Sequence, residues 1–208
     1  MFRLLAISDR RSLPNGDLTG DLTGWLADCA AAGVDAVQIR EKDLDDRALW
    51  EITRSARAIL PPGTRLLVNG RADVALAAGA DGVHLPSDGV PAAALRRRFG
   101  RGLLLGVSAH SVEEVERARD AGADYAVFGP VWETPGKGPA TGVEELARAA
   151  ASGFPVYALG GVTIERFGEV AAAGAAGVAA IRLFQRPAKI HEIRQAVEAA
   201  RRESFGTR

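Results

Sequence analysis

The chain has 208 residues, of which 47% are hydrophobic and 25% charged, a composition ordinary for a globular domain. Its 26 basic and 26 acidic side chains give a formal net charge of zero, and no basic stripe stands out, which argues against a nucleic-acid binder. The single cysteine, Cys29, forbids an intramolecular disulfide, and no apolar run reaches the length of a signal peptide or membrane span. We expect a soluble, cytoplasmic protein without a membrane partner.

Short apolar runs alternate with longer helical segments along the chain. The runs are continuously apolar or nearly so, which is typical of parallel strands buried on both faces. They predict strands at residues 3–8, 36–39, 65–68, 82–85, 103–107, 125–128, 156–159 and 177–181. The segments between them, rich in Ala, Leu, Glu and Arg at helical spacing, predict helices at 18–32, 46–60, 72–78, 91–99, 112–121, 143–151, 164–173 and 188–203.

A short repeat marks the ends of four predicted helices. Ala-Gly-Val-Asp occurs at 32–35, Ala-Gly-Ala-Asp at 78–81 and 121–124, and Ala-Gly-Ala-Ala at 173–176. Glycine is favoured where a helix ends because it tolerates positive φ. This alternation fits a closed barrel or a doubly wound sheet, and eight units without a linker favour the barrel. We therefore predict an α/β fold, a single-domain (β/α)8 TIM barrel spanning residues 1–208.

Helix starts carry capping residues. Asp45 or Asp46 precedes the second predicted helix, and Thr163 precedes the seventh. Ser111 is followed three residues later by Glu114, which is the spacing of a capping box. The sequence thus predicts side-chain caps at these three helix starts.

In such barrels the reactive groups lie at the carboxyl ends of the strands. Arg40 and Lys42 follow the second strand and could bind a phosphate or pyrophosphate, although ion pairs with Glu41 and Asp43 on the rim are an equal alternative. Asn69 follows the third strand and could orient a ring or an amide, or simply form the turn.

Two later strand ends carry groups that could transfer protons or bind anions. His110 follows the fifth strand, where a neutral imidazole could move protons near neutral pH. His84 lies inside the fourth strand and is expected to be a packed or hydrogen-bonded core residue. The long Gly- and Pro-rich loop after the sixth strand carries Lys137, which could reach an anion if the loop closed over a ligand; a mobile surface loop is the alternative.

The last two strand ends predict a phosphate site. Gly160 and Gly161 follow the seventh strand, and Ala180 and Ile181 end the eighth. Paired glycines allow backbone N–H groups to approach an anion, and these two loops form the usual phosphate site of such barrels.

Six stretches in this order resemble the thiamine phosphate synthase / TenI superfamily. They are Gln-Ile-Arg-Glu-Lys-Asp (38–43), Val-Asn-Gly-Arg-Ala-Asp-Val-Ala (68–75), Gly-Ala-Asp-Gly-Val-His-Leu (79–85), Gly-Val-Ser-Ala-His-Ser (106–111), Phe-Gly-Pro-Val-Trp-Glu-Thr-Pro (128–135) and Ala-Leu-Gly-Gly-Val (158–162). The resemblance implies a cytoplasmic enzyme of thiamine biosynthesis that binds a small phosphorylated thiazole, and suggests a homodimer.

The two branches of the superfamily differ at the magnesium ligands. The synthase branch joins a pyrimidine pyrophosphate to a thiazole phosphate with the help of Mg²⁺. At the two positions where that branch has aspartates, this chain has Gly70 and Gly89, which offer no side chain to a cation that prefers carboxylate oxygens. Asp88, one residue away, is the remaining substitute.

The TenI-like branch is therefore the first expectation. It implies a thiazole tautomerase, an isomerase that aromatises a thiazole carboxylate phosphate tautomer without a metal or other cofactor, with His110 as the acid/base. The resemblance places the phosphate on the backbone of Gly161, Ala180 and Ile181, and lines the pocket with Arg40, Lys42, Asn69, Ser108 and Thr134. Gln38 and the Thr134-Pro135 pair look more like the synthase, and Arg182 stands where both branches commonly have a small residue. The alternatives are a thiamine phosphate synthase and a non-catalytic barrel that binds thiazole or thiamine phosphate.

Overall fold

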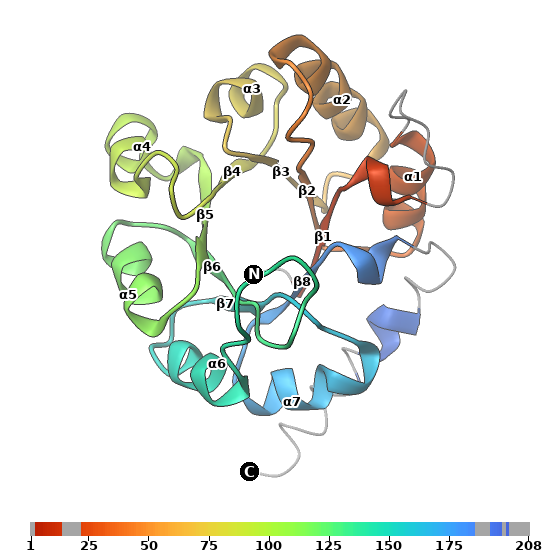
Figure 1. Ribbon diagram of the computed structural model, residues 1–208. Coiled ribbons are helices and arrows are strands. Elements are labelled where there is room, and N and C mark those ends of the chain that lie inside the picture. The colour runs from red at the N-terminus through yellow and green to blue at the C-terminus, as the bar shows by residue number, and fades with distance from the viewer. Residues whose placement is uncertain (1–2, 14–21, 186–191, 197–198, 200–208) are drawn as a thin grey trace.

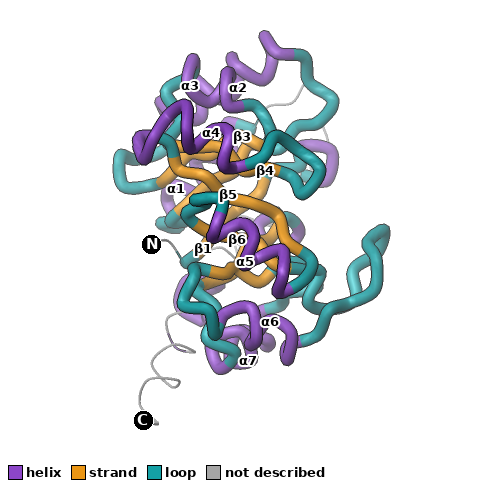
Figure 2. The backbone as a smooth tube through the Cα atoms, turned by 90° about the vertical axis from the view of Figure 1, so that its left-hand side faces the viewer, coloured by secondary structure: helices purple, strands orange, loops and turns teal. Residues whose placement is uncertain are grey.

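The computed structural model describes residues 3–13, 22–185, 192–196 and 199. Eight parallel strands close into a barrel in chain order, from β1 round to β8, which pairs with β1 (Figure 1). Turned by 90°, the molecule shows its strands inside and its helices outside (Figure 2). The predicted (β/α)8 barrel is confirmed.

The strands match the predicted runs to within two residues at each end. They are β1 (Leu4–Ile7), β2 (Ala36–Ile39), β3 (Arg65–Asn69), β4 (Gly82–Leu85), β5 (Leu104–Ala109), β6 (Tyr125–Phe128), β7 (Val156–Ala158) and β8 (Gly177–Ala180). The largest difference is at the end of β5, which continues through Ser108 and Ala109 because these residues pair with Val127 and Phe128 of β6.

The helices are α1 (Thr23–Ala31), α2 (Asp46–Ile59), α3 (Ala72–Ala77), α4 (Ala92–Phe99), α5 (Val112–Asp120), α6 (Val143–Ala150) and α7 (Phe167–Ala172). Residues 18–21 of the first predicted helix lie outside the described residues. So does most of the last one (188–203), of which residues 192–196 and 199 are described and helical. The seventh predicted helix begins as a 3₁₀ turn at Ile164–Arg166.

Two of the predicted caps are present. Asp45 accepts a hydrogen bond from the N–H of Ala48 (2.8 Å), and the Ser111 hydroxyl accepts one from the N–H of Glu114 (3.3 Å). The side-chain cap predicted for Thr163 was wrong. There the N–H of Arg166 binds the backbone carbonyl of Thr163 (3.2 Å), because the segment begins as a 3₁₀ turn and not as an α-helix.

Alternate residues of each strand face two different cores. In β1, Leu5 and Ile7 belong to a cluster inside the barrel, whereas Leu4 and Ala6 pack in the layer shared with the helices. Inside the barrel the rings of Tyr125 and Tyr157 meet edge to face, with centroids 5.5 Å apart. A Cβ atom on Gly106 would lie 2.1 Å from the Tyr125 ring, so only glycine leaves room for it. Burial on both faces explains why the strand sequences are continuously apolar.

Cys29 is fully buried in α1, where it packs as a small hydrophobic core residue. Burial raises the pKa of its thiol to about 12. Among the described residues, no helix combines the length and the apolar character that a membrane span requires.

Candidate active site

A cavity of about 600 Å³ opens where the strands end, and residues at or just beyond the ends of all eight strands contribute to its wall. Every predicted site residue lines this cavity, although their roles remain predictions. These residues are Gln38, Arg40, Lys42, Asn69, Ser108, His110, Thr134, Lys137, Gly160, Gly161, Ala180 and Ile181. In Figure 1 the loop that follows β6 passes over the open end of the barrel.

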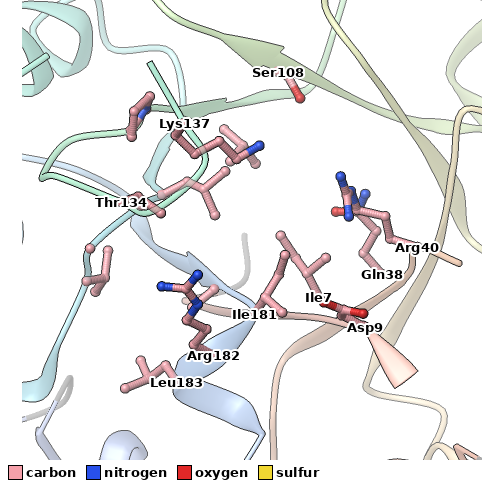
Figure 3. A pocket seen from close by; sticks show the side chains of 18 of the residues that line it. Ile7, Asp9, Gln38, Arg40, Ser108, Thr134, Lys137, Ile181, Arg182 and Leu183 are labelled. Carbon is pink, nitrogen blue, oxygen red and sulfur yellow. The ribbon is translucent and has the colours of Figure 1, made fainter. Parts of the chain in front are cut away.

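Within the described part of the chain, four cationic side chains line the cavity: Arg40, Lys42, Lys137 and Arg182. None of them forms an ion pair with a carboxylate of the described residues. Figure 3 shows Arg40 on one side of the cavity and Arg182 on another, with Lys137 extending from the loop after β6. Positive charge is thus available to an anionic ligand at several points of the wall.

Glu41 and Asp43, the acidic residues next to Arg40 and Lys42 in the sequence, form ion pairs with another arginine. Arg10, from the loop after β1, donates to Glu41 at 3.1 Å and binds Asp43 with both guanidinium nitrogens at 2.5 Å. This contact holds the pKa of the Asp43 carboxyl down at about 2. The predicted alternative, in which Arg40 and Lys42 pair with these acids, is not seen, because Arg10 takes that place.

Ser8 completes this network. Its hydroxyl donates to the buried carboxylate of Glu41 (2.5 Å) and accepts from the N–H of Arg40 (2.9 Å). The backbone that carries Arg40 is therefore fixed to the end of β1. Neither Ser8 nor Arg10 was a sequence candidate, because both lie about thirty residues before their partners and in no recognisable pattern.

His110 is held in one orientation. Its Nδ1 lies 2.5 Å from the carbonyl oxygen of Gly129, and its backbone N–H donates to Glu114 at 2.7 Å. A carbonyl oxygen can only accept, so Nδ1 carries a proton and Nε2 is the ring nitrogen that is left to exchange one with a ligand. This arrangement suits the predicted acid/base role.

His84 is buried, as predicted, but it also borders the cavity, which the sequence did not indicate. Its Nε2 lies 2.9 Å from the Ser108 hydroxyl and its Nδ1 3.3 Å from the hydroxyl of Tyr125. Burial, and secondly the charge of Arg40, lower the pKa of His84 to about 4. The ring is therefore neutral at physiological pH and orients Ser108.

Gln38 presents an unused polar atom. Its Nε2 donates to Asn69 Oδ1 at 3.0 Å, while its Oε1 is buried and has no hydrogen-bond partner among the residues that the structure describes. If the amide groups of Gln38 and Asn69 were both turned by 180°, Asn69 would donate to Gln38, and one polar atom of Gln38 would still be unpaired. An unmet buried polar group costs about 1–3 kcal/mol. Because Gln38 lines the cavity, a ligand with a complementary polar group would remove this cost.

The loops after β6 and β7 pack closely against each other. Backbone N–H groups of Val131 and Trp132 donate to the carbonyls of Leu159 (2.9 Å) and Gly160 (3.2 Å). Gly160 and Gly161 have φ of 89° and 65°, and a Cβ on Gly161 would lie 2.6 Å from Cβ of Trp132. Glycine is required here by positive φ and close packing, whatever the backbone binds.

Arg166 contacts both the loop after β6 and the loop after β7, which the sequence did not predict. Its Nη1 donates to the carbonyl of Gly161 at 2.5 Å, and its guanidinium lies 4.9 Å from the centre of the Trp132 ring. It thereby fixes the segment that the sequence predicts to bind phosphate.

The donor set does not suit magnesium. Gly70 and Gly89 provide no oxygen ligands from their side chains. The acidic residues that line the cavity within the described part of the chain are Asp9, Asp88 and Glu133. Within residues 3–13, 22–185, 192–196 and 199, no three His, Cys, Asp or Glu side chains gather in a group that could hold a metal. The residues present do not fit the metal site that the synthase branch implies.

Residues 4–184 match the sequence model of a family described as thiamine monophosphate synthase. The chain belongs to this family. A protein of Geobacter sulfurreducens named "Putative thiamine-phosphate synthase" is 46% identical over 185 residues, which are 86% of this chain and 85% of that protein. A Roseiflexus sp. (strain RS-1) protein named "Thiamine-phosphate synthase" is 40% identical over 183 residues, 84% of this chain and 75% of the relative.

A solved structure agrees with this assignment. The thiamine phosphate pyrophosphorylase from Pyrococcus furiosus is 30% identical, has a TM-score of 0.84 and covers 96% of both chains. The predicted superfamily is confirmed. The names of these family members favour the synthase alternative over the tautomerase that the glycines at 70 and 89 suggested.

Proposed function

We propose that the chain is a transferase of thiamine biosynthesis that couples hydroxymethylpyrimidine pyrophosphate to thiazole phosphate and releases pyrophosphate. The observation that carries this proposal is a cavity with unpaired cations on separate parts of its wall and one unpaired buried amide atom between strand ends. Two phosphorylated substrates require positive charge at more than one place, and the unpaired amide atom is available to a polar group of a ligand. The synthase names of the relatives support the same reaction.

Each substrate has a suitable part of the cavity. The backbone of Gly160 and Gly161 would bind the phosphate of the thiazole. Arg40, Lys42 and Lys137 would bind the pyrophosphate, and Gln38 would accept a hydrogen bond from the amine of the pyrimidine.

In the reaction, the bond from the pyrimidine methylene carbon to the pyrophosphate oxygen breaks, and a bond from that carbon to the thiazole nitrogen forms. The three cations would stabilise the negative charge on the departing pyrophosphate. Because Gly70 and Gly89 stand at the two positions where the synthase branch has aspartates, we assign this stabilisation to these three side chains.

A second candidate is the thiazole tautomerase, and the glycines at 70 and 89 favour it. In that reaction His110 Nε2 would take a proton from one atom of the thiazole carboxylate phosphate and return a proton to another. The cations would then bind the phosphate and the carboxylate of a single ligand.

Parallel assays of the purified protein test both candidates. One mixes the pyrimidine pyrophosphate with thiazole phosphate and measures thiamine phosphate; the other follows aromatisation of the thiazole tautomer by absorbance. Coupling supports the proposal, whereas aromatisation without coupling would replace it with the second candidate. Tight binding of thiazole phosphate without either reaction would indicate a non-catalytic binding protein.

A further inference from the structure

Arg182 extends the predicted phosphate site. It lies two residues beyond the end of β8, after Ile181, and begins the 3₁₀ turn Arg182–Phe184. It lines the same cavity as the backbone of Gly160, Gly161 and Ile181. Figure 3 shows its side chain next to that of Ile181, on the side of the cavity where Thr134 lies. A guanidinium therefore stands beside the backbone groups that the sequence predicts to bind phosphate.

The charge of Arg182 is not used within the described part of the chain. By comparison, two other arginines each form an ion pair with an aspartate. Arg57 lies 3.1 Å from Asp81, and Arg96 lies 2.6 Å from Asp124. No carboxylate lies within ion-pair distance of Arg182 among the described residues, and its side chain is exposed at the cavity wall. An arginine left unpaired beside a cavity is available to an anionic ligand.

We propose that Arg182 binds the phosphate group of the ligand and makes the site prefer the doubly charged form of that phosphate. The inference rests on the proposed function, since it assumes that the ligand carries a phosphate. Backbone N–H groups donate neutral hydrogen bonds, whereas a guanidinium adds a full charge and two parallel donors that match phosphate oxygens. Phosphate monoesters lose their second and last proton near pH 6, so the doubly charged form dominates above that pH.

Calorimetric titration with thiazole phosphate tests this role. Arg182→Ala should weaken binding about tenfold or more, and Arg182→Lys should weaken it less, because it keeps the charge but loses the two-pronged contact. Binding of the unphosphorylated thiazole alcohol should not change. Arg97→Ala is the matched control, since Arg97 is an exposed arginine on α4 outside the cavity, and it should bind both ligands like the wild type.

The pH dependence separates a charge contact from a structural role. The wild type should bind thiazole phosphate more weakly at pH 5 than at pH 7, and Arg182→Ala should lose most of this difference. Unchanged affinity and an unchanged pH profile in Arg182→Ala would overturn the inference. If the wild type does not bind thiazole phosphate, the proposed function fails. Titration with inorganic phosphate then tests the role of Arg182. Weaker binding of phosphate by Arg182→Ala than by the wild type supports the inference. Equal binding by the two proteins, or no binding by the wild type, overturns it.

Discussion

At the scale of single residues, the tautomer of His110 is set by an atom from another strand end. The carbonyl of Gly129 accepts from Nδ1 and leaves Nε2 as the base (2.5 Å). His110→Gln should keep the fold and ligand binding but lower aromatisation of the thiazole tautomer by 100-fold or more. Coupling, which needs no proton transfer through this ring in our proposal, should change less than tenfold. Turnover numbers for both reactions check this, and undiminished aromatisation would remove His110 as the acid/base.

Gln38 should recognise the pyrimidine half of the reaction. Gln38→Leu removes the unpaired buried atom and keeps the volume of the side chain nearly constant. We expect the KM for the pyrimidine pyrophosphate to rise about tenfold, the cost of one lost hydrogen bond, with the KM for thiazole phosphate unchanged. Equal effects on both substrates in steady-state kinetics would contradict this assignment.

His84 should make stability depend on pH. Its pKa is lowered from 6.5 to about 4 in the folded chain, so between these values the unfolded chain binds a proton that the folded chain does not. The stabilisation is therefore complete above about pH 6.5 and is lost as pH falls toward 4, by up to about 3 kcal/mol. Urea unfolding at pH 7 and pH 5 measures it. Between pH 7 and pH 5 the free energy of unfolding of His84→Gln should fall by less than that of the wild type. An equal fall in both proteins would contradict the assignment of this pH dependence to His84.

At the scale of elements, the loops after β6 and β7 behave as one packed unit. Gly161→Ala would force a Cβ to within 2.6 Å of Trp132 Cβ at a φ of 65°. We expect it to lower the melting temperature and to weaken binding of thiazole phosphate. Gly168→Ala in α7 is the control, because an added Cβ would have no described atom from outside its own helix within 4 Å, and it should stabilise the protein by about 0.5–1 kcal/mol. Calorimetry and a phosphate titration distinguish these outcomes, and a neutral Gly161→Ala would show that the loops adapt.

The same scale shows what the sequence could predict. The strands were predictable because each is buried on both faces and is therefore continuously apolar. The end of β5 was not, because Ser108 belongs to the strand only through its pairing with Val127 of β6. The 3₁₀ start of the seventh helix was not predictable either, since Thr163 has the residue type of a cap but uses its backbone carbonyl instead.

At the scale of the whole molecule, the parallel barrel explains why the candidate site was largely predictable. Closing eight parallel strands brings all their carboxyl ends to one opening, so residues picked from separate strand ends line one cavity. The pairing of charges was not predictable. Whether Arg40 and Lys42 are free depends on Arg10, which reaches Glu41 and Asp43 from the loop after β1. The homodimer stays a prediction, and light scattering of the purified protein will test it.

The measurement that tests the central claim most directly is formation of thiamine phosphate and pyrophosphate from the two phosphorylated halves, in magnesium and in chelator. We predict that both products appear in equal amounts, and that chelation leaves a substantial rate because Arg40, Lys42 and Lys137 neutralise the leaving group. Strict dependence on magnesium would contradict the assignment of that role to side chains. If neither product forms in magnesium or in chelator, the proposed coupling itself is contradicted.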